Sequence, residues 1–229
     1  MGLLPLSSFA VPIITNGNFS AGDTGFINGQ QYVGSGAAHA IGTQGSGASG
    51  CSAGNAMVPE DTYAVAQHAS DCHPAWLNFT DHTGDAAALM LIVNGSTRTA
   101  DDAWAQSVSG WEAGHSYTLT AYARNVFTQA PATLQFFVDA TPVTGVLVLN
   151  TDGSVGGWQQ FLADCGPGAP CTAPGPHTLS IRNTSTVQFG NDFALDDISV
   201  RDNGIVPEPT TSALMAAGLI GLALIRRKK

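Results

Sequence analysis

Four cysteines are the residues of this 229-residue chain whose type and number most directly indicate chemistry. They are Cys51, Cys72, Cys165 and Cys171. An even number of cysteines favours disulfide bonds when a chain leaves the reducing cytoplasm. Proximity in the sequence predicts the pairs Cys51–Cys72 and Cys165–Cys171, each closing a Gly- or Pro-rich loop.

Cys72 also lies close to two histidines, His68 and His73, which suggests a metal site as the alternative. A His-x3-Cys-His pattern lacks the partner pair at the spacing that zinc sites normally show. We therefore favour the disulfides.

The tryptophans are the residues best suited to stack on the apolar face of a sugar ring. There are four of them, Trp76, Trp104, Trp111 and Trp158. Trp104 and Trp158 fall in predicted strands, where a tryptophan is most often part of the core. Trp76 falls in a loop and is the one we predict to bind a ligand.

No catalytic motif is present. The chain has no Gly-x-Ser-x-Gly, no His-Glu-x-x-His and no phosphate-binding loop, and glutamate occurs only at positions 60, 112 and 208. The number of Asp and Glu residues would allow a carboxylate pair of the kind that hydrolyses glycosides, but no sequence pattern indicates one. We predict no catalytic residue and a protein that is not an enzyme.

Charge is distributed very unevenly along the chain. Up to Ile225 there are four Lys and Arg against 17 Asp and Glu, a formal charge of −13, while the last four residues are all basic. An acidic surface excludes nucleic acid as a partner, because nucleic-acid binding needs basic stripes. Neutral sugars and divalent cations remain compatible with it.

The C-terminal segment has three parts in a fixed order. Pro207, Glu208 and Pro209 come first, an uncharged run follows from Ala213 to Ile225, and the cations of residues 226–229 end the chain. Thirteen to fifteen residues form roughly 20–23 Å of helix, short of the roughly 30 Å hydrocarbon core. The run predicts a single short transmembrane helix whose basic end stays in the cytoplasm.

This segment resembles the PEP-CTERM sorting domain of Gram-negative bacteria, through Val206-Pro207-Glu208-Pro209, the short Gly/Ala/Leu helix and the Arg-rich end. The resemblance implies processing by an exosortase, a membrane protease. It also implies an inner-membrane-anchored precursor that reaches the cell surface or extracellular matrix. Pro207, Glu208 and Pro209 are then residues that the protease recognises.

The N-terminus carries an incomplete export signal. Residues 1–10 contain a small apolar patch and end in Ser8-Phe9-Ala10, a small-x-small pattern, but lack a basic region and a full apolar core. We interpret them as the tail of a signal peptide whose start lies upstream, with Val11 or Pro12 as the mature start. The alternative interpretation is that the protein has no such signal peptide and is not exported by the usual route.

The middle of the chain reads as short strands separated by turns. Tyr117, Leu119, Ala121 and Ala123 alternate with polar residues, a clear period of two. Besides the strand around Trp104, strands are predicted at 88–93, 116–124, 133–139, 145–149, 158–162, 177–182 and 193–201. The Gly-rich stretch from Tyr32 to Gly54 is predicted as a long loop. The pattern predicts an all-β sandwich.

Both ends and the middle of this region resemble jelly-roll carbohydrate-binding modules of the galactose-binding-like fold. The matching segments are Asn16–Phe19, Gly190–Val200, Trp104–Gln106 and Ala113–Leu119. The resemblance implies a jelly-roll β-sandwich ectodomain at residues 11–202. Residues 1–10 precede it as signal-peptide tail, and residues 203–229 follow it as linker and sorting segment.

Asp196 is notable because a regular strand places it on the same face as Ile198 and Val200, which we expect in the core. An inward carboxylate is costly unless it is hydrogen-bonded or bound to metal. Backbone capping by the aspartate is one solution.

The jelly-roll resemblance implies the other solution, one structural Ca²⁺ held by Asn18, Asp23, Asp196 and Asp197. Ser20 departs from the family pattern, which usually has Glu there. The missing carboxylate weakens a site for a hard cation.

These observations lead to one functional hypothesis and two alternatives. The first is an exported, non-enzymatic surface or matrix protein, sorted through its C-terminal signal, that binds carbohydrate or extracellular polysaccharide. The alternatives are a secreted glycan-active hydrolase on the same jelly-roll scaffold and an inert structural component of a biofilm.

Overall fold

The computed structural model describes residues 14–36, 39–95, 98, 101–151, 157–166, 168–187 and 189–206. The predicted signal-peptide tail, the motif at 207–209 and the apolar run and basic end after it lie outside these residues. Among the helices of the described part, none has the length and apolar character needed to cross a membrane.

The described residues form strands and two short 3-10 helices. In chain order these are β1 (Gln31–Tyr32), β2 (Thr62–Ala66), η1 (Ala69–Asp71), β3 (Met90–Asn94), β4 (Asp102–Trp111), β5 (His115–Asn125), β6 (Thr133–Val138), β7 (Thr141–Pro142), β8 (Leu147–Val148), β9 (Gln159–Cys165), η2 (Pro170–Thr172), β10 (Gly175–Asn183) and β11 (Phe193–Ile205).

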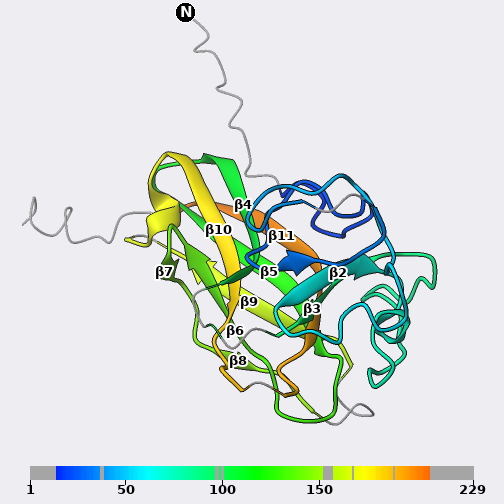
Figure 1. Cartoon of the computed structure of the whole chain (residues 1–229). Coiled ribbons are helices and arrows are strands. Elements are labelled where there is room, and N and C mark those ends of the chain that lie inside the picture. The colour runs from blue at the N-terminus through cyan, green and yellow to red at the C-terminus, as the bar shows by residue number, and fades with distance from the viewer. Residues whose placement is uncertain are drawn as a thin grey trace, which may run out of the picture.

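The strands build two sheets that pack face to face (Figure 1). One sheet has the order β1-β2-β3-β11-β5-β9, and the other has the order β4-β10-β6-β7 with β8 paired to β6. All pairs are antiparallel except β1 with β2. The all-β sandwich is confirmed, and β11 continues past the predicted boundary at residue 202.

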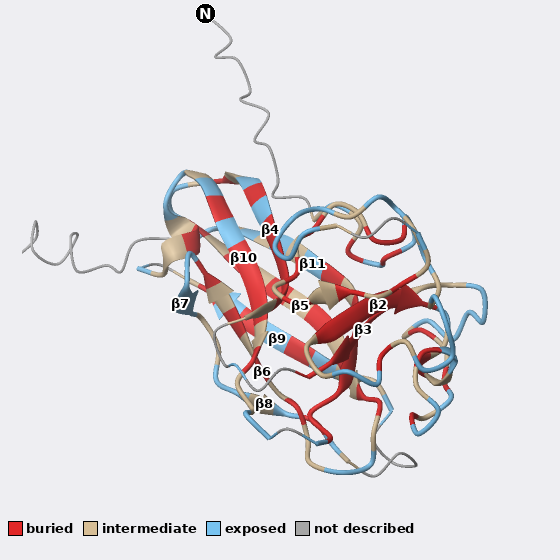
Figure 2. Cartoon of the chain, in the orientation of Figure 1, coloured by how far each residue is buried: buried red, intermediate tan, exposed pale blue. Residues whose placement is uncertain are grey.

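The six-stranded sheet is buried on both faces at β2 and β3 but on only one face at β5. Every residue of β2 and β3 is buried, whereas β5 alternates between buried and partly exposed positions (Figure 2). The inner face packs in the core between the sheets, while Met90 and Ile92 belong to a second apolar cluster on the outer face. This explains why the predicted strand at 88–93 is continuously apolar.

Two connections cover that outer face, and a disulfide joins them to each other. Of the second cluster, Met57 comes from the connection between β1 and β2, and Ala69, Trp76 and Phe79 come from the connection between β2 and β3. Cys51 and Cys72 are bonded, with Cα atoms 5.3 Å apart. The predicted pairing is therefore confirmed.

The second predicted disulfide, Cys165–Cys171, is also present, with Cα atoms 6.2 Å apart. Because Cys72 is bonded to Cys51, its sulfur is not a free thiolate for the alternative metal site. One ring nitrogen of His68, Nδ1, lies 3.0 Å from the carbonyl oxygen of Phe79.

The expectation that Asp196 shares a face with Ile198 is wrong. The pairing of β11 with β5 shifts register between Asp196 and Ser199, and Asp197 has a φ of 47°. This β-bulge inserts a residue and reverses the alternation beyond it. Asp196 therefore lies on the outer face with Ala194, while Ile198 packs in the inner core.

Candidate functional site

Polar residues from distant parts of the chain meet at one end of the six-stranded sheet. Asn94, the last residue of β3, pairs with Thr62 at the start of β2. Phe193, the first residue of β11, pairs with Val93 and with Asn125, the last residue of β5. The antiparallel register therefore brings together the segments that precede β2 and β11 and those that follow β3 and β5.

These segments and the connection between β2 and β3 line a cavity of about 230 Å³, which we call the Trp76 pocket. It is lined by Val58, Glu60, His73, Trp76, Asn94, Phe127, Phe189, Gly190 and Asp192. Aromatic rings and carboxylates thus line the same space, the composition typical of a small-molecule site.

Trp76 forms a fixed wall of the pocket. Its side chain is almost buried and stacks on His73, with ring centroids 4.8 Å apart. The Trp76 side chain also faces the Asp192 carboxyl closely enough to lower its pKa. The backbone N–H of Gly95 donates a hydrogen bond to Asp192 Oδ1 at 3.0 Å. The indole is therefore held before any ligand arrives.

Two acceptors of the pocket have no partner. Glu60 Oε2 and Asn94 Oδ1 are both buried without a hydrogen-bond partner. The Asn94 side-chain amide already donates to the carbonyl oxygen of Met57. Buried acceptors of this kind are costly to leave unpaired, so the pocket is suited to a ligand rich in hydrogen-bond donors.

The two carboxylates of the pocket are both hard to ionise. Burial and, to a smaller extent, the nearby Asp192 charge raise the pKa of the Glu60 carboxyl to about 7. Burial also raises the pKa of Asp192 to about 6, against the lowering effect of the Gly95 N–H and the Trp76 side chain. Burial lowers the pKa of His73, which favours the neutral ring.

Glu60→Gln is expected to stabilise the protein at about pH 8 and to have little effect at about pH 4. The folded-state pKa of Glu60 lies above its unfolded value of 4.5. Its contribution to stability is therefore fully present at low pH and is lost as the pH rises from 4.5 to about 7. Urea unfolding across this range checks the prediction. Glu112→Gln, outside the pocket, is the control, and an equal pH response of both variants would refute the assignment.

Exposed apolar side chains form the rim of the pocket. Phe189 is 70% exposed and Val58 is 53% exposed, although both lie beside the buried Trp76. Large apolar side chains held at the mouth of a cavity are suited to contact a ligand that enters it.

The structure places the predicted metal ligands in different surroundings. Asn18 and Asp197 line one cavity of about 460 Å³ on the open part of the six-stranded sheet, together with Tyr122. Asn18 Oδ1 accepts a hydrogen bond from the Ser20 hydroxyl at 2.9 Å. Asp197 Oδ2 lies 2.7 Å from His82 Nδ1.

Asp196 does not line that cavity, and both oxygens of its carboxylate are hydrogen-bonded. Its oxygens accept hydrogen bonds from the backbone N–H groups of His82, at 3.0 Å, and Asp197, at 2.8 Å. Burial raises its pKa to about 7, opposed by these hydrogen bonds. This geometry is that of backbone capping.

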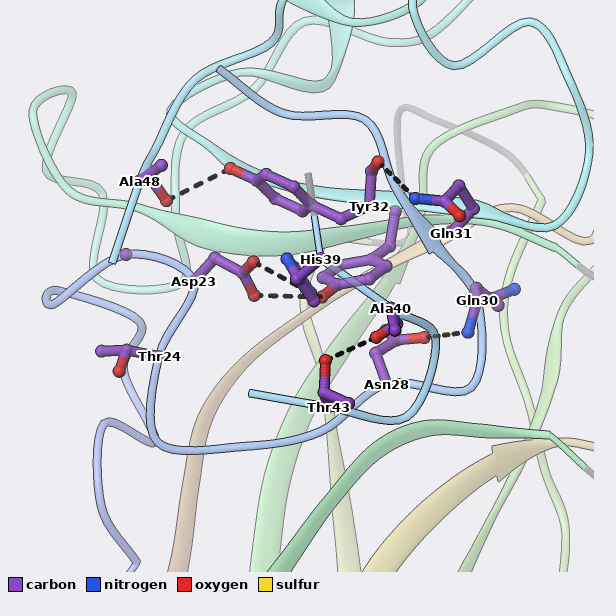
Figure 3. A network of polar contacts seen from close by, with 12 residues as sticks. Asp23, Thr24, Asn28, Gln30, Gln31, Tyr32, His39, Ala40, Thr43 and Ala48 are labelled. Carbon is purple, nitrogen blue, oxygen red and sulfur yellow. Dashed lines mark hydrogen bonds and ion pairs between the residues drawn. The ribbon is translucent and has the colours of Figure 1, made fainter. Parts of the chain in front are cut away.

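Asp23 instead organises the Gly-rich stretch that follows β1 (Figure 3). It is fully buried, accepts a hydrogen bond from the Tyr63 hydroxyl at 3.1 Å, and lies 3.5 Å from His39 Nε2. A Cβ at Gly45 would overlap the Asp23 carboxylate, so only glycine fits where the chain crosses it.

The four predicted ligands are therefore divided between separate hydrogen-bond networks. Among the described residues, no group of three or more His, Cys, Asp or Glu side chains is arranged to hold a metal ion. Calcium binding stays a prediction.

The other tryptophans have mainly structural positions. Trp104 is completely buried in the core between the sheets, and Trp111 is nearly so. Trp158 is only partly buried at the edge of the second cluster, where its indole N–H donates to the carbonyl oxygen of Thr80 at 3.2 Å. Of the four, only Trp76 lines the pocket that also holds carboxylates.

Sequence reasoning pointed to Trp76 but missed the carboxylates beside it. Glu60 and Asp192 are far apart in the chain and belong to no motif. The available signal was positional, because each lies just before a strand of the same sheet.

Comparison with protein families decides the nature of the C-terminal segment. Residues 206–228 match the PEP-CTERM protein-sorting motif. The chain carries a PEP-CTERM sorting signal. The match includes Pro207, Glu208 and Pro209, and their recognition by the protease stays a prediction. The PEP-CTERM signal implies export, a membrane-anchored precursor and processing by an exosortase.

Solved structures show that the sandwich is a known fold. The Stig cyclase Fisc from Fischerella sp. TAU, bound to an indole compound, is 12% identical, with a TM-score of 0.50 over 86% of this chain and 99% of that chain. At this identity the likeness shows the fold alone.

Smaller parts of the chain are similar to sugar-binding domains. The CBM22-1 xylan-binding domain from Paenibacillus barcinonensis is 15% identical, with a TM-score of 0.40 over 52% of this chain and 74% of that chain. The sugar-binding EclA C-terminal domain is 15% identical, with a TM-score of 0.37 over 44% of this chain and 66% of that chain, just under two thirds. No curated protein matches the chain.

Proposed function

We propose that this PEP-CTERM protein is a non-enzymatic component of the cell surface or extracellular matrix and that its sandwich binds carbohydrate in the Trp76 pocket. The observation that carries the proposal is the joint lining of one cavity by aromatic rings and unpaired acceptors. Sugars present apolar C–H faces and hydroxyl donors, so they complement both kinds of lining.

The size of the pocket limits the ligand. Its volume of about 230 Å³ is below the roughly 300–1,000 Å³ of pockets that hold drug-sized molecules. We infer that it takes a single sugar ring, such as the end of a chain or a branch, and that the rest of a polysaccharide stays outside against Phe189.

One observation favours the hydrolase as a second candidate. Glu60 and Asp192 share the pocket and both have raised pKa values, as a general acid for glycoside cleavage requires. Release of reducing sugar from a polysaccharide, abolished by Asp192→Asn, would support this candidate and refute the non-enzymatic role.

Replacing Phe189 with alanine is expected to weaken saccharide binding about tenfold, because an exposed aromatic ring at the mouth contributes contact to the ligand but little to the core. A glycan array identifies the saccharide, and calorimetry with the best ligand measures the loss. Leu162→Ala is the matched control, since Leu162 is 51% exposed and lies outside the pocket. Equal effects of the two variants, or an array without binding, would contradict the proposal.

A further inference from the structure

We propose that the Trp76 pocket selects sugars that carry a protonated amine, and therefore binds amino sugars in preference to neutral ones. This inference rests on the proposed carbohydrate-binding function and names the ligand class within it. Three features of the pocket support it: its hydrogen-bond inventory, its charge and its aromatic walls.

Two hydrogen-bond donors beside the polar lining are already in use. The Gly95 amide donates to Asp192, and the Asn94 side-chain amide donates to the Met57 carbonyl oxygen. What the pocket offers a ligand are the buried acceptors Glu60 Oε2 and Asn94 Oδ1. An ammonium group is a pure donor with three N–H bonds, and it complements this inventory better than a hydroxyl, which also presents lone pairs.

The charge of the lining points to the same ligand. Two carboxyl groups line the pocket, Glu60 before β2 and Asp192 before β11, and the charge of Asp192 raises the pKa of Glu60 in addition to burial. Among the described lining residues, His73 is the one side chain that can become cationic, and burial opposes its protonation. The neighbouring Asp61 is engaged by Arg98 at 2.6 Å. A ligand ammonium would supply the counter-charge that this lining lacks.

Aromatic rings complete the environment. Trp76, Phe127 and Phe189 line the same cavity as the carboxylates. The faces of such rings attract cations, and tryptophan does so most strongly. The formal net charge of −9 also steers a cationic sugar toward the protein.

The test compares three methyl glycosides by calorimetry at about pH 7: glucosamine, N-acetylglucosamine and glucose. The protein is the full chain in a polyoxyethylene detergent, which has no sugar headgroup. We expect the glucosamine to bind at least about tenfold more tightly than the other two, as charge-assisted hydrogen bonds exceed neutral ones. Added salt should reduce this preference.

Glu60→Gln should lower the affinity for the glucosamine glycoside about tenfold, and Glu112→Gln should leave this affinity unchanged. Thermal unfolding of each variant shows that it is folded. Equal binding of all three glycosides, or a glucosamine preference that survives Glu60→Gln, would overturn the inference while leaving carbohydrate binding intact. Absence of binding by any saccharide, on the array or in solution, would overturn the proposed function itself.

Discussion

Replacing Pro207, Glu208 and Pro209 with alanine is expected to trap the full-length protein in the membrane. Each proline fixes φ and pushes the preceding residue toward an extended conformation, the form in which a protease reads a peptide. Alanine has the highest helix propensity, so the change would extend the apolar helix into the recognition segment. Membrane fractionation and immunoblotting of the ectodomain measure the ratio of precursor to released protein.

The matched control replaces Thr210, Thr211 and Ser212 with alanine, which changes the same number of residues between the motif and the apolar run. We expect this variant to be processed. If the variant without Pro-Glu-Pro is released as efficiently as the control, the sorting role of the motif is wrong.

Removing the Cys51–Cys72 disulfide is expected to lower the free energy of unfolding by about 3 kcal/mol. The two cysteines are 21 residues apart, and the restriction that the bond places on the unfolded chain grows with the logarithm of the length of the loop that it closes. The same bond ties the connection between β2 and β3, which carries His73 and Trp76, to the connection that precedes β2. The double variant Cys51→Ala/Cys72→Ala should therefore also lose affinity for the saccharide.

The Cys165–Cys171 disulfide provides the comparison within the same chain. Its cysteines are only six residues apart, and its removal should cost about 2 kcal/mol. It lies at the end of β9, away from the residues that line the Trp76 pocket, so saccharide affinity should not change. Urea unfolding and calorimetry of both double variants measure the two effects. Equal losses of affinity would show that the first disulfide has no particular role in shaping the pocket.

The strands could be predicted because their burial pattern is local. Tyr117, Leu119, Ala121 and Ala123 alternate in the sequence and all lie in the inner core of β5. β2 was not among the predicted strands, because its five residues include two alanines and show no alternation when both faces are buried. The bulge at Asp197 was also missed, since nothing in the pattern marks where a strand gains a residue.

The candidate site could be predicted only in part, because it is a product of tertiary pairing. Trp76 stood out by its residue type and loop position. Glu60, Asn94 and Asp192 become neighbours through the register of β2, β3 and β11, which single-sequence patterns do not reveal. The sorting signal is the opposite case: its residues are contiguous, and the sequence alone identified it.

NMR titration of the backbone amide and tryptophan indole N–H signals tests most directly where a bound saccharide contacts the sandwich. We expect the Trp76 signals to shift, because Trp76 lines the pocket, while the signals of the fully buried Trp104 do not. Shifts confined to residues around Tyr122 and Asp197, on the open part of the sheet, with Trp76 unchanged, would contradict this expectation.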